Sequence, residues 1–321
     1  MPVNLDKPQN WKTDIALSVD MYNDWFMNFA PQAFRTTRVQ TTIDVETALN
    51  ITANLTNFSP SKLREHPEIL PTLRMSTCPP IAVDRLIGLS GVAPNVVKSM
   101  ELDKRLPQRM SALEADDHLT KIGAIISRLV DPDIFVWIGR DQPPTQVETH
   151  RAATIVADRL CGAVANPIMR NAQEKRQLLA IKTWLEAKGY SALPGGNSVK
   201  FDDMPPGTFS FRMNVPVKLE GGVQEVNIPI DAVIMPLTAK LGDYPIFFEA
   251  KSAGDFTNTN KRRKEEAVKM AQLRTTYAPH PVKFNLFLCG YFDSGYLGYE
   301  AAEGIDWVWE HRIDDLALFG I

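Results

Sequence analysis

The chain has 321 residues, of which 44% are hydrophobic and 23% charged, and its formal net charge is −3 at pH 7. This length and composition are typical of a globular protein with two domains, or with one large, elaborated domain. The slightly negative net charge excludes a nucleic-acid-binding protein that is basic overall, so any DNA-binding surface is expected to be local.

The sequence gives no indication of secretion or membrane insertion. No basic start followed by an apolar run is present at the N-terminus, and no apolar segment is long enough to span a bilayer. The three cysteines, at positions 78, 161 and 289, show no CxxC spacing, which argues against a zinc site or a disulfide framework. We therefore expect a cytoplasmic protein with no membrane partner.

The first part of the chain is predicted to be mainly helical. Apolar residues recur at intervals of three and four between Trp11 and Phe29, which indicates an amphipathic helix that Pro31 is expected to end. A similar pattern predicts a helix over residues 113–129, and a high alanine content predicts another over residues 147–164.

A second set of signals marks the middle of the chain. The segment 139–145 contains glycine and two prolines and is the best candidate for a linker, so we divide the chain into regions 1–146 and 147–321. Asn166 and Pro167 are typical of the start of a helix, which then runs to Lys188.

From Tyr190 onward the apolar period changes to two, which indicates strands. We expect strands at Thr208–Val217, Gln224–Met235, Pro245–Lys251 and Phe284–Cys289, with a charged helix at Lys261–Tyr277. The predicted fold class is therefore α/β (α+β), with a mostly helical N-terminal half and a central sheet flanked by helices.

Two of the predicted strands deliver charged residues. Asp231 follows Asn-Ile-Pro-Ile, and Glu249 and Lys251 follow Ile-Phe-Phe. Side chains alternate along a strand, so Glu249 and Lys251 point to the same face, and pairing with the strand of Asp231 would bring all three together. Carboxylates and a backbone carbonyl, here that of Ala250, suit a hard cation such as Mg²⁺, and a nearby lysine can orient water. The pattern predicts a metal-dependent phosphodiesterase site.

A simpler interpretation of this motif stays open. Glu249 and Lys251 can form an ion pair at the end of a strand without any catalytic role. The same acid-x-lysine spacing recurs at Glu186 and Lys188, where it is predicted to lie on a helix surface.

Candidate DNA contacts follow the predicted site directly. Amides and hydroxyls suited to phosphates or base edges precede a basic run between Thr257 and Lys264. The alternative is a helix start with i,i+4 ion pairs, including Arg262 with Glu266. Two arginines of the helical half are further candidates, for which a solvated face is the alternative. The candidate set is Asn258, Asn260, Lys261, Arg262, Arg263, Lys264, Arg35 and Arg38.

The motifs Pro229-Ile-Asp231 and Glu249-Ala-Lys251 resemble those of the PD-(D/E)xK nuclease superfamily. Within that superfamily, the chain resembles the XamI family of type II restriction endonucleases. The segments that carry the resemblance are Leu17–Phe26, His150–Leu160, Phe248–Asn260 and Gly304–His311. The resemblance covers nearly the whole chain.

The resemblance implies a PD-(D/E)xK-type core with a central mixed sheet. It implies that Asp231 and Glu249 bind Mg²⁺, that Lys251 is the catalytic lysine and that Glu174 is a further acid of the site. It also implies a homodimer that cuts double-stranded DNA at a short palindrome, of the GTCGAC type. Residues 1–146 would then serve DNA binding and dimerisation, and residues 147–321 catalysis.

Two other functions fit the residues. One is a nuclease of the same fold that acts in DNA repair or recombination and reads DNA structure rather than sequence. The other is a DNA-binding protein without catalytic activity, in which Asp231 and Glu249 are only ion-pair partners.

Overall fold

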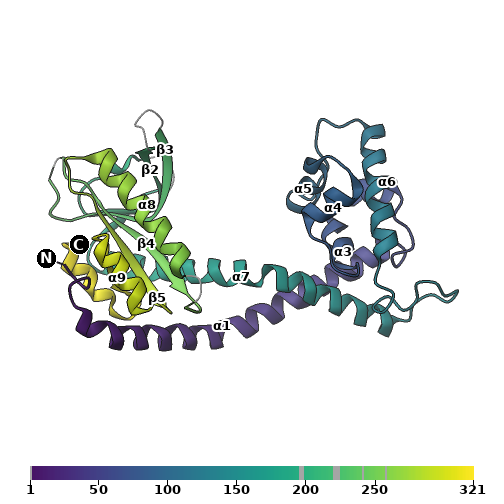
Figure 1. The fold of residues 1–321 in the computed structure, drawn as a ribbon, viewed down its shortest axis with the longest axis horizontal. Helices are drawn as coiled ribbons and strands as arrows, with labels where there is room; N and C mark the ends of the chain where they lie inside the picture. The colour runs from purple at the N-terminus through teal and green to yellow at the C-terminus, as the bar shows by residue number, and fades with distance from the viewer. Residues whose placement is uncertain (1, 195–198, 220–224, 241, 257–258) are drawn as a thin grey trace. The chain divides into compact units, whose positions relative to one another are not determined.

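A computed structural model describes residues 2–194, 199–219, 225–240, 242–256 and 259–321, and it leaves out the side chains of residues 164, 166 and 259–263. The chain forms two compact units, one made of Met1–Phe29 with Ile168–Ile321 and the other of Ala30–Pro167. Figure 1 shows a sheet in the first unit and helices in the second. In the described part of the chain, no helix is long and apolar enough to cross a membrane.

The unit Ala30–Pro167 is built from helices around one apolar core. Its short helices are α2 (Pro60–Glu65), α3 (Leu70–Met75), α4 (Val83–Ser90), α5 (Pro94–Leu102) and α6 (Ala112–Leu129), with a 3-10 turn at Pro67–Ile69. The side chain of Ser111 caps α6 by accepting a hydrogen bond from the backbone N–H of Glu114. Leu49, Leu119 and Val156 are fully buried in the core, which joins the ends of two longer helices to the short ones.

Those longer helices, α1 (Pro8–Ile51) and α7 (Gln146–Ala187), each belong to both units. The predictions that Pro31 ends a helix and that Pro167 begins one were wrong, because both prolines lie inside continuous helices. A proline removes one backbone hydrogen bond and crowds the preceding turn. Apolar packing of the helix on both sides of each proline outweighs that cost, as with Tyr22 and Val45 of α1.

The other unit contains a six-stranded mixed sheet. Its strands, in spatial order, are β1 (Ser191–Ala192), β2 (Thr208–Lys218), β3 (Glu225–Met235), β4 (Ile246–Ala253), β5 (Lys283–Gly290) and β6 (Asp306–Trp309). The pairs β2–β3 and β3–β4 are antiparallel, and the other three pairs are parallel.

Helices cover both faces of this sheet, which confirms the predicted fold class (Figure 1). The second part of α7 packs on one face, with Ile181 in the same buried cluster as Phe248. On the other face α8 (Thr259–Tyr277) and α9 (Ser294–Ala302) bury Leu273 and Leu297 with Phe247. The 3-10 segments Phe201–Asp203 and Glu310–Phe319 complete the unit.

The first residues of the chain pack on the last strand of this sheet. The Asp306 carboxylate accepts hydrogen bonds from the backbone N–H groups of Asn4 and Leu5, at 2.9 and 3.1 Å. Farther along α1, the Ser18 hydroxyl accepts a hydrogen bond from the N–H of Gly290 at 2.8 Å. The roles expected for residues 1–146 and 147–321 stay predictions.

Candidate active site

Asp231 and Glu249 come together where β3 and β4 separate. The paired residues nearest this point are Ala232 and Phe248. Just beyond them, Asp231 Oδ2 accepts a hydrogen bond from the N–H of Ala250 at 2.9 Å. A backbone N–H at the end of strand pairing needs an acceptor, and here a carboxylate supplies it. Asp231 is therefore held beside the strand that carries Glu249 and Lys251.

Burial and like charge dominate the electrostatics of the two acids. The pKa of Asp231 is raised to about 6. Burial is the main cause, and the charge of Glu249 is the next. Glu249 is itself buried on the face of β4 that is covered by α8. Two carboxylates in such a place favour binding of a cation, because a cation offsets their repulsion.

The ammonium of Lys251 lies between two acids. Its Nζ is 3.2 Å from Glu249 Oε1 and 3.3 Å from Glu266 Oε1. Burial lowers the pKa of Lys251, but the charges of Glu249 and Glu266 outweigh burial and raise it overall. The Glu249–Lys251 ion pair that served as the simpler interpretation is thus present, and it is part of a larger network.

Helix α8 adds an acid for which the sequence predicted no role in the site. Glu266 is fully buried. The alternative i,i+4 pair with Arg262 is not tested, because the side chain of Arg262 is not described. Its carboxylate faces Lys251 and also accepts a hydrogen bond from the Tyr296 hydroxyl at 3.2 Å. Burial raises the pKa of Glu266 to about 6. A signal existed, because Glu266 shares one helix face with the apolar Met270 and Leu273.

A second lysine of α8 also reaches the site. Lys269 lies one turn beyond Glu266, and its Nζ is 2.6 Å from Glu249 Oε1 and 3.2 Å from the carbonyl oxygen of Pro229. Sequence reasoning missed this residue because nothing in the local pattern of a charged helix distinguishes one lysine from its neighbours.

Glu174, the predicted fourth acid, lies on α7 and is bound to Arg212. Its Oε1 accepts hydrogen bonds from Arg212 Nε and Nη2 at 2.9 and 2.5 Å. The charge of Glu174 contributes least among the influences on the pKa of Asp231. Its membership of the site stays a prediction.

Helix α7 also supports the strands beneath the site. The Gln177 side-chain amide donates hydrogen bonds to the carbonyl oxygens of Lys251 and Phe287, at 3.2 and 3.3 Å. These two bonds tie β4 to β5 directly behind the lysine, and they fix the backbone from which Lys251 extends.

The candidate DNA contacts are spread over two elements. Asn258 lies outside the described residues, and Asn260, Lys261, Arg262 and Arg263 lie in α8 with side chains that are not described. Lys264 is exposed on α8. On α1, Arg35 is exposed and Arg38 forms an exposed ion pair with Asp158 at 3.3 Å. Their contacts with DNA stay predictions.

The oxygen atoms of the site fit a divalent metal. In the described part of the chain, no group of three or more His, Cys, Asp or Glu side chains is arranged to hold one. Mg²⁺ needs less, because one or two carboxylates complete its shell with water and substrate phosphate. Asp231, Glu249 and the Ala250 carbonyl supply such oxygens. Glu249 Oε2 is buried and accepts no hydrogen bond from any described residue, so it can accept a cation.

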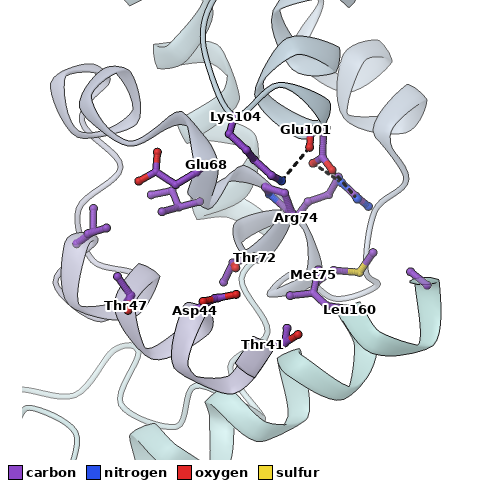
Figure 2. A pocket seen from close by; sticks show the side chains of 14 residues that line it. Thr41, Asp44, Thr47, Glu68, Thr72, Arg74, Met75, Glu101, Lys104 and Leu160 are labelled. Atoms are coloured by element: carbon purple, nitrogen blue, oxygen red, sulfur yellow. Dashed lines mark hydrogen bonds and ion pairs between the residues drawn. The ribbon is translucent and has the colours of Figure 1, made fainter. Parts of the chain in front are cut away.

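A separate pocket of ≈ 520 Å³ lies within the unit Ala30–Pro167 (Figure 2). Asp44, Glu68 and Glu101 line it, together with Arg74 and Lys104. Arg74 is already bound to Glu101 through two hydrogen bonds of 2.9 and 3.1 Å. A lining with three acids and a paired arginine is a poor site for a DNA phosphate.

Comparisons with known proteins identify the family of the chain. A family model described as XamI restriction endonuclease matches residues 53–309. The chain is 53% identical over 318 residues to the type II restriction enzyme SalI of Streptomyces albus G, with 99% of each chain covered. No solved structure matches the chain. A match of this extent confirms the resemblance noted in the sequence: the chain belongs to the XamI restriction endonuclease family.

Proposed function

We propose that this restriction endonuclease hydrolyses double-stranded DNA at a short palindrome and uses Mg²⁺ to do so. The observation that carries the proposal is the meeting of Asp231, Glu249 and Lys251 where β3 and β4 separate. Asp231, Glu249 and the Ala250 carbonyl would hold the metal. This arrangement on a mixed sheet is what the PD-(D/E)xK superfamily leads one to expect.

Each residue has a separate task in the proposed reaction. Bound Mg²⁺ supplies Lewis-acid stabilisation of the phosphate and a more acidic water. Lys251 donates hydrogen bonds that orient the attacking water and offset the negative charge of the transition state. Glu266 is a second negatively charged partner that keeps Lys251 in place. Glu174 is the fourth acid that we propose for the site, and Arg212 orients it.

The proposals for recognition and assembly rest on family membership rather than on the site. We propose a homodimer, in which each subunit cuts one strand of a palindrome of the GTCGAC type. The basic start of α8, with Asn258, Asn260 and Lys261–Lys264, is proposed to contact DNA next to the cutting site, and Arg35 and Arg38 to contact it from α1. We infer that the enzyme acts on DNA in the cytoplasm.

Digestion of a DNA of known sequence tests this proposal. With Mg²⁺, the wild type is expected to give discrete fragments whose ends share one short palindrome, and chelation is expected to stop the reaction. Lys251→Ala is expected to lower the cleavage rate by at least about a hundredfold. Lys182→Gln, which removes an exposed lysine–glutamate pair on α7, is the matched control and should cut like the wild type.

Other outcomes would point to the rival functions. A smear of fragments, or cutting only at branched DNA, would indicate a repair or recombination nuclease. Sequence-specific binding without any cutting would indicate a binding protein. Undiminished cleavage by Lys251→Ala would remove this lysine from the mechanism.

A further inference from the structure

One oxygen of Glu249 is shared by two lysines. Glu249 Oε1 lies 2.6 Å from Lys269 Nζ and 3.2 Å from Lys251 Nζ. The other oxygen, Oε2, is buried and has no hydrogen-bond donor among the described residues. Both ammonium groups therefore lie at Oε1 of Glu249, and none from a described residue donates a hydrogen bond to Oε2.

The two lysines differ in their second partner. Their side chains are similarly exposed, at 19% for Lys251 and 22% for Lys269. Lys251 is also held by the Glu266 carboxylate at 3.3 Å, whereas Lys269 is also held by the neutral carbonyl of Pro229 at 3.2 Å. Among the described residues, Glu249 is the only carboxylate that contacts Lys269, whereas Lys251 also has Glu266 as a negatively charged partner. A cation bound to Glu249 therefore takes away the one negatively charged partner of Lys269 but leaves Lys251 with Glu266.

We propose that Lys269 is a positioning residue that holds Glu249 in the metal-free enzyme and gives it up to the incoming divalent metal. The inference rests on the proposed role of Glu249 as a metal ligand. Without Lys269, the repulsion between Asp231 and Glu249 would be offset by Lys251 alone among the two lysines. With Lys269, the carboxylate is kept in its binding geometry, at the cost of competition with the metal.

Competition between Lys269 and the metal can be tested by the direction in which metal affinity changes when Lys269 is replaced. A lysine that only anchors α8 to β4 would stabilise the fold, and its loss would leave metal affinity unchanged or weaker. A lysine that competes with the metal for one carboxylate must lower metal affinity, so its loss makes binding tighter. The two roles therefore predict opposite changes in the same quantity.

Titration with Mn²⁺ in the absence of DNA, followed by electron paramagnetic resonance of the free ion, distinguishes the two roles. Lys269→Gln is expected to bind Mn²⁺ about tenfold more tightly than the wild type. Lys269→Arg keeps the charge and should stay close to the wild type. Lys182→Gln is the matched control for loss of a lysine–glutamate contact in the same unit, and its affinity should not change. Where the glutamine variant does not fold, Lys269→Met keeps the apolar stem and removes only the charge.

Unchanged or weaker Mn²⁺ binding by a folded Lys269→Gln overturns the proposal. A tighter site that survives Glu249→Gln also overturns it, because the metal would then bind elsewhere. Absence of Mn²⁺ binding in both the wild type and the charge-removed variant overturns it as well. Wild-type digestion of DNA tests the proposed function separately, so cleavage at a palindrome combined with an unaltered titration would refute only the role of Lys269.

Discussion

Glu300 offers a stability test of the acidic network behind the candidate site. It lies on α9, its side chain is almost completely buried, and burial is the main reason that its pKa is raised from 4.5 to about 8. The charge of Glu266 is the next largest cause. The perturbation is Glu300→Gln, which keeps the shape of the side chain and removes its titration.

The sign follows from proton binding in the two states. Between pH 4.5 and about pH 8, the unfolded chain has released the Glu300 proton while the folded protein retains it. The contribution of this group to the free energy of unfolding is therefore fully present below pH 4.5 and is lost as the pH rises to about 8. The interval corresponds to about 5 kcal/mol at most, because each tenfold change in the protonation equilibrium is worth about 1.4 kcal/mol.

Urea denaturation at about pH 5 and about pH 9 measures the effect. Tryptophan fluorescence is a suitable signal, because Trp307 and Trp309 are fully buried in the same unit. The wild type should lose several kcal/mol more than Glu300→Gln between the two pH values, so the variant becomes the more stable of the two at high pH. Glu186→Gln, at an exposed position on α7 in the same unit, serves as the control and should follow the wild type.

Parallel stability curves for the wild type and Glu300→Gln would refute the reasoning. They would mean that the carboxyl of Glu300 ionises in the folded protein at an ordinary pH, and that the space between α8 and α9 is more polar than its burial indicates.

Three further changes test other parts of the chain. Gly290→Ala should lower the free energy of unfolding by about 3–5 kcal/mol, because Gly290 has φ +100° and a Cβ there would overlap the carbonyl oxygen of Ala253. Thermal denaturation measures this loss, and a loss below about 1 kcal/mol would contradict the prediction. Arg74→Ala leaves the nearly buried Glu101 without its partner and should cost about 3–5 kcal/mol, measured by urea denaturation, whereas an unchanged midpoint would show that the pair is solvated. Arg38→Ala should weaken DNA binding, and the slope of the logarithm of the binding constant against the logarithm of salt concentration should fall by about one in magnitude, as measured by fluorescence anisotropy. Arg64→Ala removes an arginine from a similarly exposed ion pair and is the control. Equal effects of the two substitutions would exclude a specific contact by Arg38.

Strands and helices were predictable where one period dominated a segment. The predicted strand Thr208–Val217 is β2 of the structure with one residue added, and the predicted helix Lys261–Tyr277 is α8 with two residues added at its start. Alternation along β4 also placed Glu249 and Lys251 on one face, as the shared network with α8 shows. These features depend on neighbours within a few residues, which a sequence displays directly.

The rest depends on contacts between distant segments. Pro31 was expected to end a helix because a local rule contains no information about the packing on both sides of it. The sequence offered only Arg262 as an ion-pair partner of Glu266, because Lys251 lies on another element. Arg212 has a left-handed φ of +53° between two regular β2–β3 pairs. An arginine in a strand gives no sequence signal for this conformation. The family resemblance supplied roles for Asp231, Glu249 and Lys251 but none for the residues of α8.

The division of the chain into units has a consequence for the order of folding. The helical unit Ala30–Pro167 is continuous in sequence and has its own core, so all of it has been synthesised before most of the sheet. The sheet unit is interrupted, because Asn4 and Leu5 precede Asp306, to which they bind, by 302 and 301 positions. Synthesis must therefore pass Asp306 before the unit that carries Asp231, Glu249 and Lys251 can close. A nascent chain accordingly completes its candidate cutting site after its helical unit.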